Sequence, residues 1–413
     1  MIFLSASQRL EREGDELTAA DRHSEAILAY HQAVTADNNN RSALLKLAPL
    51  FYGQGRTRDA GEIISKLSGA EKAVFTSGMS EVVPENLDHL ELQWIKSPGV
   101  DTPIGITADS DMVVAAYQTG LIASLRLQDG TILWSQKLSE TLTSPPALSS
   151  NSIFVGSESG KVIALDRKTG DIIWQAQLPG AVYAGLLIDG LTGYIGSYGG
   201  VMSAIRLADG KILWQVETGS PILASAMKEA STIFFGTVGG SVYSVDATNG
   251  NALWEKPAQL PGGIESQPVL AGNRLLISNN DSRLYVLDLN GKDYFWAYST
   301  PDSIYANPIV DGNRVYLFSI GQTAAAVDLA TGSLIWEQDL PVAVGHTPVL
   351  AQSVIYFAGT TLPFLYEMDS LTGKITGQAN TGDWIEYGPI QASEYLLLAG
   401  KDGAILDYRI IED

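Results

Sequence analysis

The stretch LIASLRLQDGTILW, residues 121–134, recurs along the chain and decides its fold. Close copies are KVIALDRKTGDIIW, VMSAIRLADGKILW, SVYSVDATNGNALW, RLYVLDLNGKDYFW and TAAAVDLATGSLIW, which end at Trp174, Trp214, Trp254, Trp296 and Trp336. Counted from Trp94, the first four intervals between tryptophans are 40 residues each. A fixed period of this length is typical of propellers and solenoids.

The internal pattern of the repeat predicts a β-propeller. Each copy has two short runs rich in Val, Ile, Leu and Tyr, joined by a polar turn that ends in Gly, which indicates a β-hairpin. Two more apolar runs precede each hairpin, such as SPPALSS and SIFVGSE before Trp174. Four strands per period predict four-stranded blades arranged around an axis, in a mainly β protein.

Two residue types in the repeat have an architectural explanation. A Trp is large enough to fill the space between adjacent blades and has one N–H to place. An Asp just before the turn can accept backbone N–H groups and fix the hairpin. The residues concerned are Trp94, Trp134, Trp174, Trp214, Trp254, Trp296 and Trp336, and Asp166, Asp246, Asp288, Asp328 and Asp369. Arg126, Arg206 and Arg409 replace the Asp in three copies.

The number of blades follows from the third strands. Eight such segments can be read: IASLR, VIALD, MSAIR, VYSVD, LYVLD, AAAVD, LYEMD and ILDYR. The last has no fourth strand after it, whereas LELQWIK, residues 90–96, has no hairpin partner before it. If LELQWIK completes the last blade, no open sheet edge remains. We therefore predict an eight-bladed propeller over residues 87–413, closed by its own N-terminal strand.

Some copies depart from the pattern. Gly291 stands five residues before Trp296 rather than four, which suggests one extra residue in that hairpin. Gly377 stands where the seventh blade should have its Trp, and Trp384 lies beyond the register. Together with the insertion TTLPF at residues 360–364, this predicts that the ring is least regular at the seventh blade.

Residues 1–68 have a different periodicity. Apolar and small residues fall at three- and four-residue spacing, which predicts amphipathic helices. Gly14, Ala26, Tyr30 and Ala33 match the tetratricopeptide pattern, and Ala48, Ala60, Ile64 and Leu67 follow 34 residues later. We predict a small all-α, tetratricopeptide-like domain over 1–68. Residues 69–86 are then a linker.

Composition excludes several functions. The chain of 413 residues has no Cys, so disulfides, thiolate metal sites, cysteine nucleophiles and a lipid anchor on Cys are impossible for it as given. The formal net charge is −20, of which residues 87–413 carry −17, and such a surface disfavours nucleic acid. The opening MIFLSASQ is too weakly apolar for a secretory signal, which leaves a cytoplasmic protein or a processed chain as alternatives.

The recurring pattern LDxxTGxxxW, as in Leu165-Asp166 to Trp174, resembles the pyrroloquinoline-quinone-type (PQQ-like) propeller repeat. That repeat occurs in quinone-dependent dehydrogenases and in non-enzymatic scaffolds. Many of the dehydrogenases stack the quinone on a vicinal disulfide, which a chain without Cys lacks. In length and blade number the chain is similar to the BamB family of outer-membrane-protein assembly factors. The resemblance implies a non-enzymatic, protein-binding scaffold in the periplasm or elsewhere in the cell envelope, with membrane contact only indirect or through a partner, and with no cofactor.

A ligand site in the central funnel is the alternative function. The first strands of the blades converge there, and polar side chains precede their recurrent Pro, namely Glu265, Tyr305, His346, Glu386 and Tyr387. Carboxylates, an imidazole and aromatic faces could bind a cation or a sugar. Polar side chains that simply meet water are the other interpretation, and we assign no catalytic, cofactor-binding or metal-ligating residue. A quinone-dependent dehydrogenase or a small-ligand sensor therefore remains open beside the scaffold.

Overall fold

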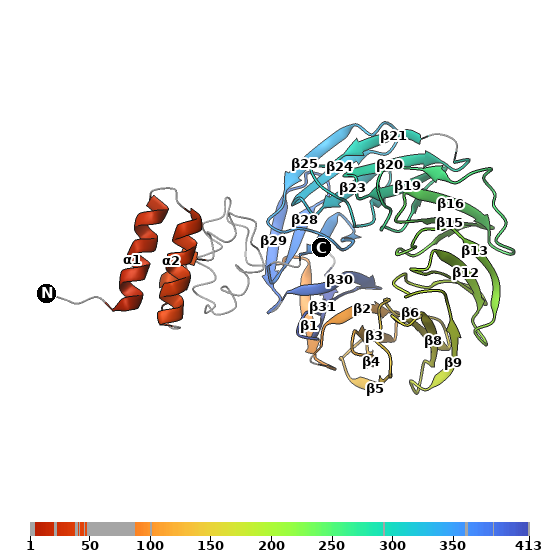
Figure 1. The fold of residues 1–413 in the computed structure, drawn as a ribbon, viewed down its shortest axis with the longest axis horizontal. Helices are drawn as coiled ribbons and strands as arrows, with labels where there is room; N and C mark the ends of the chain where they lie inside the picture. The colour runs from red at the N-terminus through yellow and green to blue at the C-terminus, as the bar shows by residue number, and fades with distance from the viewer. Residues whose placement is uncertain are drawn as a thin grey trace. The chain divides into compact units, whose positions relative to one another are not determined.

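The computed structural model describes residues 5–19, 23–37, 40, 42–44, 46–47, 87–99, 101–291, 294–359, 362–382 and 384–411. The chain divides into two units, Met1–Pro84 and Glu85–Asp413. The first contains helices and the second contains the β-strands (Figure 1). Each unit is described by itself below.

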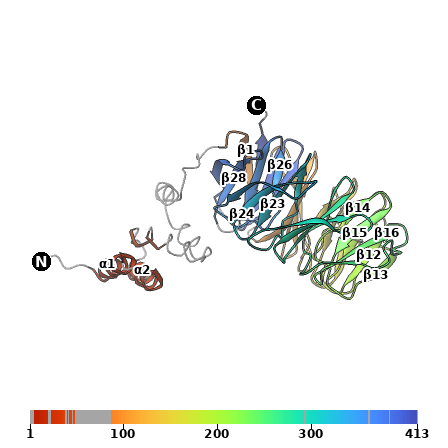
Figure 2. The ribbon, with the colours of Figure 1, turned by 90° about the horizontal axis from the view of Figure 1, so that it is seen from above.

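Two helices of the first unit, α1 (Ala6–Ala19) and α2 (His23–Ala36), lie side by side (Figures 1 and 2). A Cβ added to Gly14 would lie only 2.6 Å from Cε1 of Tyr30, so the absence of a side chain lets the two helices approach. Ala26 and Ala33 are fully buried. These positions show the close packing that small residues allow. The second predicted repeat, with Ala48, Ala60, Ile64 and Leu67, lies outside the described residues.

The second unit is a ring of eight four-stranded antiparallel blades, which confirms the predicted fold (Figure 1). Blade 1 contains β2 (Pro103–Ala108), β3 (Met112–Tyr117), β4 (Leu121–Arg126) and β5 (Ile132–Lys137). Blade 2 contains β6 (Ala147–Leu148), β7 (Ser152–Gly156), β8 (Lys161–Asp166) and β9 (Ile172–Gln177). Blade 3 contains β10 (Leu187–Asp189), β11 (Thr192–Gly196), β12 (Val201–Arg206) and β13 (Ile212–Glu217). Blade 4 contains β14 (Met227–Glu229), β15 (Thr232–Gly236), β16 (Ser241–Asp246) and β17 (Ala258–Gln259).

Blades 5 and 6 contain β18 (Val269–Ala271), β19 (Arg274–Asn279), β20 (Arg283–Asp288), β21 (Tyr294–Ser299), and β22 (Ile309–Asp311), β23 (Arg314–Ser319), β24 (Thr323–Asp328), β25 (Leu334–Asp339). Blades 7 and 8 contain β26 (Val349–Ala351), β27 (Val354–Ala358), β28 (Phe364–Asp369), β29 (Ile375–Asn380), and β30 (Ile385–Ala392), β31 (Tyr395–Gly400), β32 (Ile405–Ile410), β1 (Leu90–Lys96).

The core lies between successive blades rather than within one sheet. The second strand of a blade is covered on both faces, and β3 is accordingly buried at all six residues, MVVAAY. One hydrophobic cluster joins blades 1 and 2 through residues such as Val114 and Ile153, and another joins blades 8 and 1 through Leu397 and Val113. Because each blade buries both of its faces against neighbours, the ring needs every blade in place.

Blade 8 is closed by the strand that the sequence predicts. β1 pairs antiparallel with β32, from Leu90 opposite Ile410 to Lys96 opposite Ile405, with a bulge between Leu92 and Trp94. The backbone N–H of Ile411 also donates to the carbonyl of His89 at 2.8 Å. The closing strand therefore covers the edge that β32 would otherwise expose.

The structure corrects the position of the extra residues. Val286 pairs with Trp296 in the same register in which Ala326 pairs with Trp336, so the hairpin of blade 5 is not longer. The additional length lies in blade 4, where Ser241 pairs with Gln259, 18 residues on, whereas blade 3 pairs Val201 with Glu217, 16 residues on.

The insertion in blade 4 interrupts its outer strand. Pro257 precedes the short β17 and has no N–H to donate to a sheet. A pocket of about 260 Å³ lies beside the interruption, lined by side chains that include Tyr243, Trp254 and Pro257. None of the helices that the structure describes is long and apolar enough to cross a membrane.

Candidate functional site at the junction of blades 7 and 8

Seven of the eight blade junctions are joined by the repeat Trp. In each, the indole Nε1–H donates to a backbone carbonyl of the next blade at 2.8 to 3.0 Å. The donors and acceptors are Trp94 to Leu127, Trp134 to Arg167, Trp174 to Leu207, Trp214 to Ala247, Trp254 to Leu289, Trp296 to Leu329 and Trp336 to Ser370. The Trp thus adds a hydrogen bond to its packing between blades.

The turn glycine of the next blade lies against this indole. Gly170 has a positive φ of 77°, and a Cβ there would lie 2.6 Å from Cε3 of Trp134. Asp166 fixes the same turn, since its Oδ1 accepts the backbone N–H groups of Lys168 and Thr169 at 2.8 and 2.9 Å. The hydrogen bond from Thr169 is the largest influence that holds the pKa of Asp166 below its ordinary value. The repeat Trp, Gly and Asp therefore form one structural unit.

The junction of blades 7 and 8 lacks this unit. Gly377 on β29 occupies the Trp position and pairs with Glu367 on β28. Trp384 does not substitute for it, and its ring instead lies 4.9 Å from Nζ of Lys401. The junction is therefore irregular, as the sequence predicts.

Glu367 holds the chain segment that enters the propeller. Its side chain is fully buried, and its carboxylate accepts the backbone N–H groups of Asp88 at 3.3 Å and His89 at 3.2 Å. Nδ1 of His89 lies 3.4 Å from Oε2 of Glu367. Burial raises the pKa of Glu367, and the contacts with His89 oppose that rise. The segment leading to β1 thus contacts the blade that has no Trp.

Asp407 occupies the matching position in blade 8. It lies on β32 opposite Trp94 and is fully buried. Neither of its carboxylate oxygens has a hydrogen-bond partner within the ranges described above. Burial raises the pKa of Asp407 to about 7. An unpartnered carboxylate in this position costs folding free energy whenever it is ionised.

The sequence analysis missed both carboxylates. The residues opposite the repeat Trp in blades 1, 2, 3, 5 and 6 are uncharged: Ser124, Ala164, Ala204, Val286 and Ala326. The acids at this strand position, in LYEMD and ILDYR, are the signal that could have revealed them.

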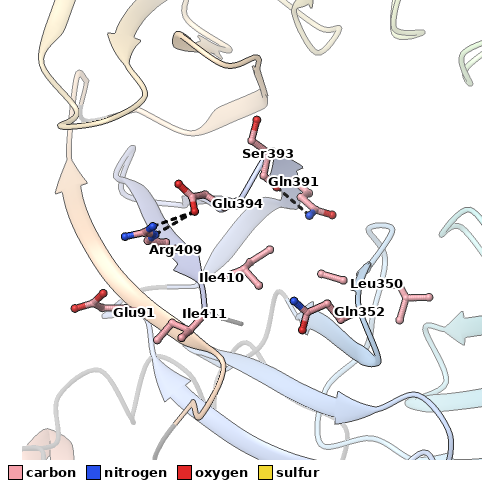
Figure 3. A pocket seen from close by; sticks show the side chains of 10 residues that line it. Glu91, Leu350, Gln352, Gln391, Ser393, Glu394, Arg409, Ile410 and Ile411 are labelled. Atoms are coloured by element: carbon pink, nitrogen blue, oxygen red, sulfur yellow. Dashed lines mark hydrogen bonds and ion pairs between the residues drawn. The ribbon is translucent and has the colours of Figure 1, made fainter. Parts of the chain in front are cut away.

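A pocket of about 760 Å³ opens at the same junction (Figure 3). Its apolar lining comes from Leu350, Ala351, Ile410 and Ile411, and its polar lining from Glu91, Gln352, Gln391, Ser393, Glu394 and Arg409. Arg409 donates from Nε and Nη2 to one oxygen of Glu394, at 3.2 and 3.1 Å. A concave surface with apolar and hydrogen-bonding groups of both charges is suited to binding a polypeptide segment.

The funnel residues predicted from the sequence are partly exposed and come from blades 5 to 8. The structure brings His346 and Tyr387 together, with ring centroids 5.4 Å apart. Burial lowers the pKa of His346, and a hydrogen bond to the backbone of Glu386 opposes this. Glu265 instead accepts a long hydrogen bond of 3.4 Å from Asn280, and within the described residues Tyr305 makes no hydrogen bond or ring contact with the other four.

Polar side chains near the axis join neighbouring first strands. Oδ1 of Asn307 accepts the backbone N–H of Gln267 at 2.8 Å, and Oγ1 of Thr347 accepts that of Asn307 at 2.9 Å. Gln267 itself donates to the carbonyl of Ala226 at 3.0 Å. These bonds connect adjacent blades. Within the described part of the chain, no three His, Cys, Asp or Glu side chains are grouped so as to hold a metal ion.

The blade architecture, the Trp junctions and the closing strand define the class as an eight-bladed propeller of PQQ-like repeats. The sequence model of the family described as outer membrane protein assembly factor BamB matches residues 118–319 and 295–383. Because these matches span more than half of the chain, the protein belongs to this family. A comparison with curated proteins finds no match.

Solved structures share the fold at low sequence identity. BamB from Moraxella catarrhalis is 19% identical with a TM-score of 0.70, over 78% of this chain and 100% of that one. The computationally designed protein Ika8 is 15% identical with a TM-score of 0.67, over 76% and 97%. A quinohemoprotein alcohol dehydrogenase, ADHIIG from Pseudomonas putida HK5, is 12% identical with a TM-score of 0.65, over 80% and 78%. At these identities the likeness concerns the fold alone.

Proposed function

We propose that the protein is a non-enzymatic, protein-binding scaffold of the bacterial cell envelope that acts in outer-membrane protein assembly. Membership of the BamB family carries this proposal, because the family's description names that role. We place the protein in the periplasm or at the envelope, with membrane contact through a partner. Under this proposal the tetratricopeptide-like domain over 1–68, the linker over 69–86 and the propeller over 87–413 act together in one complex.

The pocket at the junction of blades 7 and 8 is the surface that we assign to a protein partner. It combines a floor that includes Leu350 and Ile410 with the exposed ion pair of Arg409 and Glu394. Ile411 is 42% exposed at its edge. An apolar centre surrounded by polar and charged groups is the usual composition of a protein interface. The pocket lies at the one described junction that the repeat Trp does not join.

Site-specific cross-linking tests the proposal in the full-length chain. A photoreactive residue replaces Gln391, which lines the pocket, and in a control it replaces Leu213, which is 46% exposed on the outer strand of blade 3. We expect cross-links from position 391 to a component of the outer-membrane assembly machinery in envelope fractions, and none to that component from position 213. Equal capture at both positions would argue against the assigned surface.

A second measurement separates the scaffold from the enzyme. The purified protein is incubated with pyrroloquinoline quinone and Ca²⁺, then assayed with alcohols and sugars and an artificial electron acceptor. We expect neither stoichiometric quinone binding nor reduction of the acceptor. Turnover in this assay would show that the protein is a dehydrogenase rather than a scaffold. A ligand sensor would be indicated if a sugar or cation shifts the NMR signals of His346 and Tyr387 and the protein forms no cross-link to a protein partner.

A further inference from the structure

The closing strand β1 and the residues before it contact two buried carboxylates. Glu367 accepts the backbone N–H groups of Asp88 and His89, immediately before the strand. Asp407 lies opposite Trp94 within it. Paired residues of antiparallel strands project from the same face of a sheet, so Trp94 covers Asp407. Separation of β1 from β32 would therefore expose Asp407 to water and release the donors of Glu367.

The two carboxylates differ in the hydrogen-bond donors that surround them. Glu367 has two backbone donors and the imidazole of His89, whereas both oxygens of Asp407 are buried without a partner among the described residues. The architecture does not require an acid there, because Ala164 and Ala204 occupy the same position opposite Trp174 and Trp214.

Among the described residues, no charged side chain on the elements packed around Asp407 pairs with it. The charged and titratable side chains of these elements are Glu91 and Lys96 on β1, Tyr117 on β3, Arg126 on β4, Glu386 and Tyr387 on β30, Tyr395 on β31, and Tyr408 and Arg409 on β32. Tyr117 donates to the carbonyl of Gly403, Arg126 pairs with Asp129, and Arg409 pairs with Glu394. None of these side chains hydrogen-bonds to Asp407 in the described structure.

We propose that β1 is a proton-sensitive clasp, which closes the ring tightly when Asp407 is protonated and separates more readily from β32 when Asp407 is ionised. The clasp sets how readily β1 leaves the edge of blade 8. This inference concerns the closure of the ring and holds whichever partner the protein binds.

The direction of the effect follows from where the proton binds more tightly. Burial raises the pKa of Asp407 from an ordinary value of 3.8 to about 7 in the closed ring. In the open form the carboxyl is hydrated and titrates near its ordinary value. Closure is therefore strongest below about pH 4 and weakens as the pH rises to about 7, above which it is constant. Burial raises the pKa of Glu367 as well, so its effect has the same sign.

Hydrogen exchange of the full-length protein tests the clasp. Protection factors of the backbone amides in residues 90–96 are measured at pH 5.5 and pH 8 and corrected for intrinsic exchange. For a pKa near 7 in the closed form, we expect protection in β1 to fall about thirtyfold over this range. Amides of β12 in blade 3 should change much less, since they do not depend on β1.

Variants of Asp407 test whether this residue causes the pH dependence of protection in β1. Asp407→Ala introduces the residue that blades 2 and 3 have at this position, and Asp407→Asn keeps the shape if the alanine variant folds poorly. Both should remove most of the dependence on pH, whereas Glu158→Gln, at an exposed position in blade 2, should keep it. Equal protection of β1 at the two pH values in the unmodified protein, or an unchanged dependence in the Asp407 variants, would overturn the proposal.

Discussion

Two Trp junctions differ by a single hydrogen bond and allow its contribution to be measured. Trp174 packs on Phe154 and Trp214 on Tyr194, each with ring centroids 5.8 Å apart and interplanar angles of 43° and 41°. At the junction of blades 3 and 4, the carbonyl of Ala247 accepts from both the indole of Trp214 and the hydroxyl of Tyr194, at 3.0 and 3.1 Å. In blade 2, Phe154 has no hydroxyl and cannot donate.

The substitutions Trp174→Phe and Trp214→Phe remove similar apolar area but leave different carbonyls. After Trp214→Phe, Ala247 keeps the hydrogen bond from Tyr194. After Trp174→Phe, the carbonyl of Leu207 loses the indole donor that the structure gives it. The net value of a hydrogen bond is about 1 kcal/mol, and a buried carbonyl without a partner costs about 1 to 3 kcal/mol. We expect Trp174→Phe to be more destabilising than Trp214→Phe by about 1 kcal/mol.

Urea unfolding followed by far-UV circular dichroism measures the difference, with the slope m compared to confirm that the unfolding transition is unchanged. Adding Tyr194→Phe to Trp214→Phe should remove the remaining donor and cost about another 1 kcal/mol. Tyr194→Phe alone should cost less, because Trp214 still donates. Equal losses for the two Trp variants, or additive losses for Trp214 and Tyr194, would refute the reasoning.

Three further predictions concern the closing strand and the irregular junction. Deleting residues 87–96 exposes the edge of β32 and empties the space of Trp94, so we expect aggregation or a large loss of thermal stability in size-exclusion and melting experiments; a soluble variant with unchanged melting would contradict this. Gly377→Trp restores the repeat, but the indole would compete for the space near Glu367, and we expect a lower urea midpoint rather than a higher one. The contribution of Asp407 to the stability of the propeller should fall between about pH 4 and pH 7 by up to about 4 kcal/mol, and Asp407→Ala should remove this contribution in urea titrations at several pH values, because the pKa of this buried acid is raised to about 7.

The sequence predicts the ring because the blade is repeated. Trp134 and Gly170 have counterparts at every regular junction, and Asp166 has counterparts where Arg does not replace it, so their spacing predicts both the hairpin and the contact with the next blade. The closing strand is predictable for a different reason. The last third strand of the propeller sequence lacks a fourth strand, the first strand lacks a hairpin partner, and pairing the two leaves no open edge.

The candidate site is harder to predict because it consists of departures from the repeat. The absence of Trp at Gly377 is visible in the sequence, but the facing Glu367 is bonded by residues 88–89, which are remote in the chain. Burial of Glu367 and Asp407 depends on contacts between blades, which the order of residues does not state. The longer interval from Trp254 to Trp296 was visible, yet the turn glycine Gly291 pointed to the wrong blade.

One cause accounts for both Gly377 and Glu367. The chain enters the propeller beside β32, and its last described residue, Ile411, contacts the incoming His89 there, so two chain segments share this junction. An indole at position 377 would compete with them, whereas a carboxylate at position 367 can accept the amides that the incoming segment offers. Asp407 does not follow from this cause. Trp94 is present opposite Asp407, and blades with the same Trp have Ala in the position of Asp407. The burial of Asp407 therefore needs a separate reason, for which we propose the proton-sensitive clasp. Asp407→Ala tests the clasp without disturbing the entry of the chain.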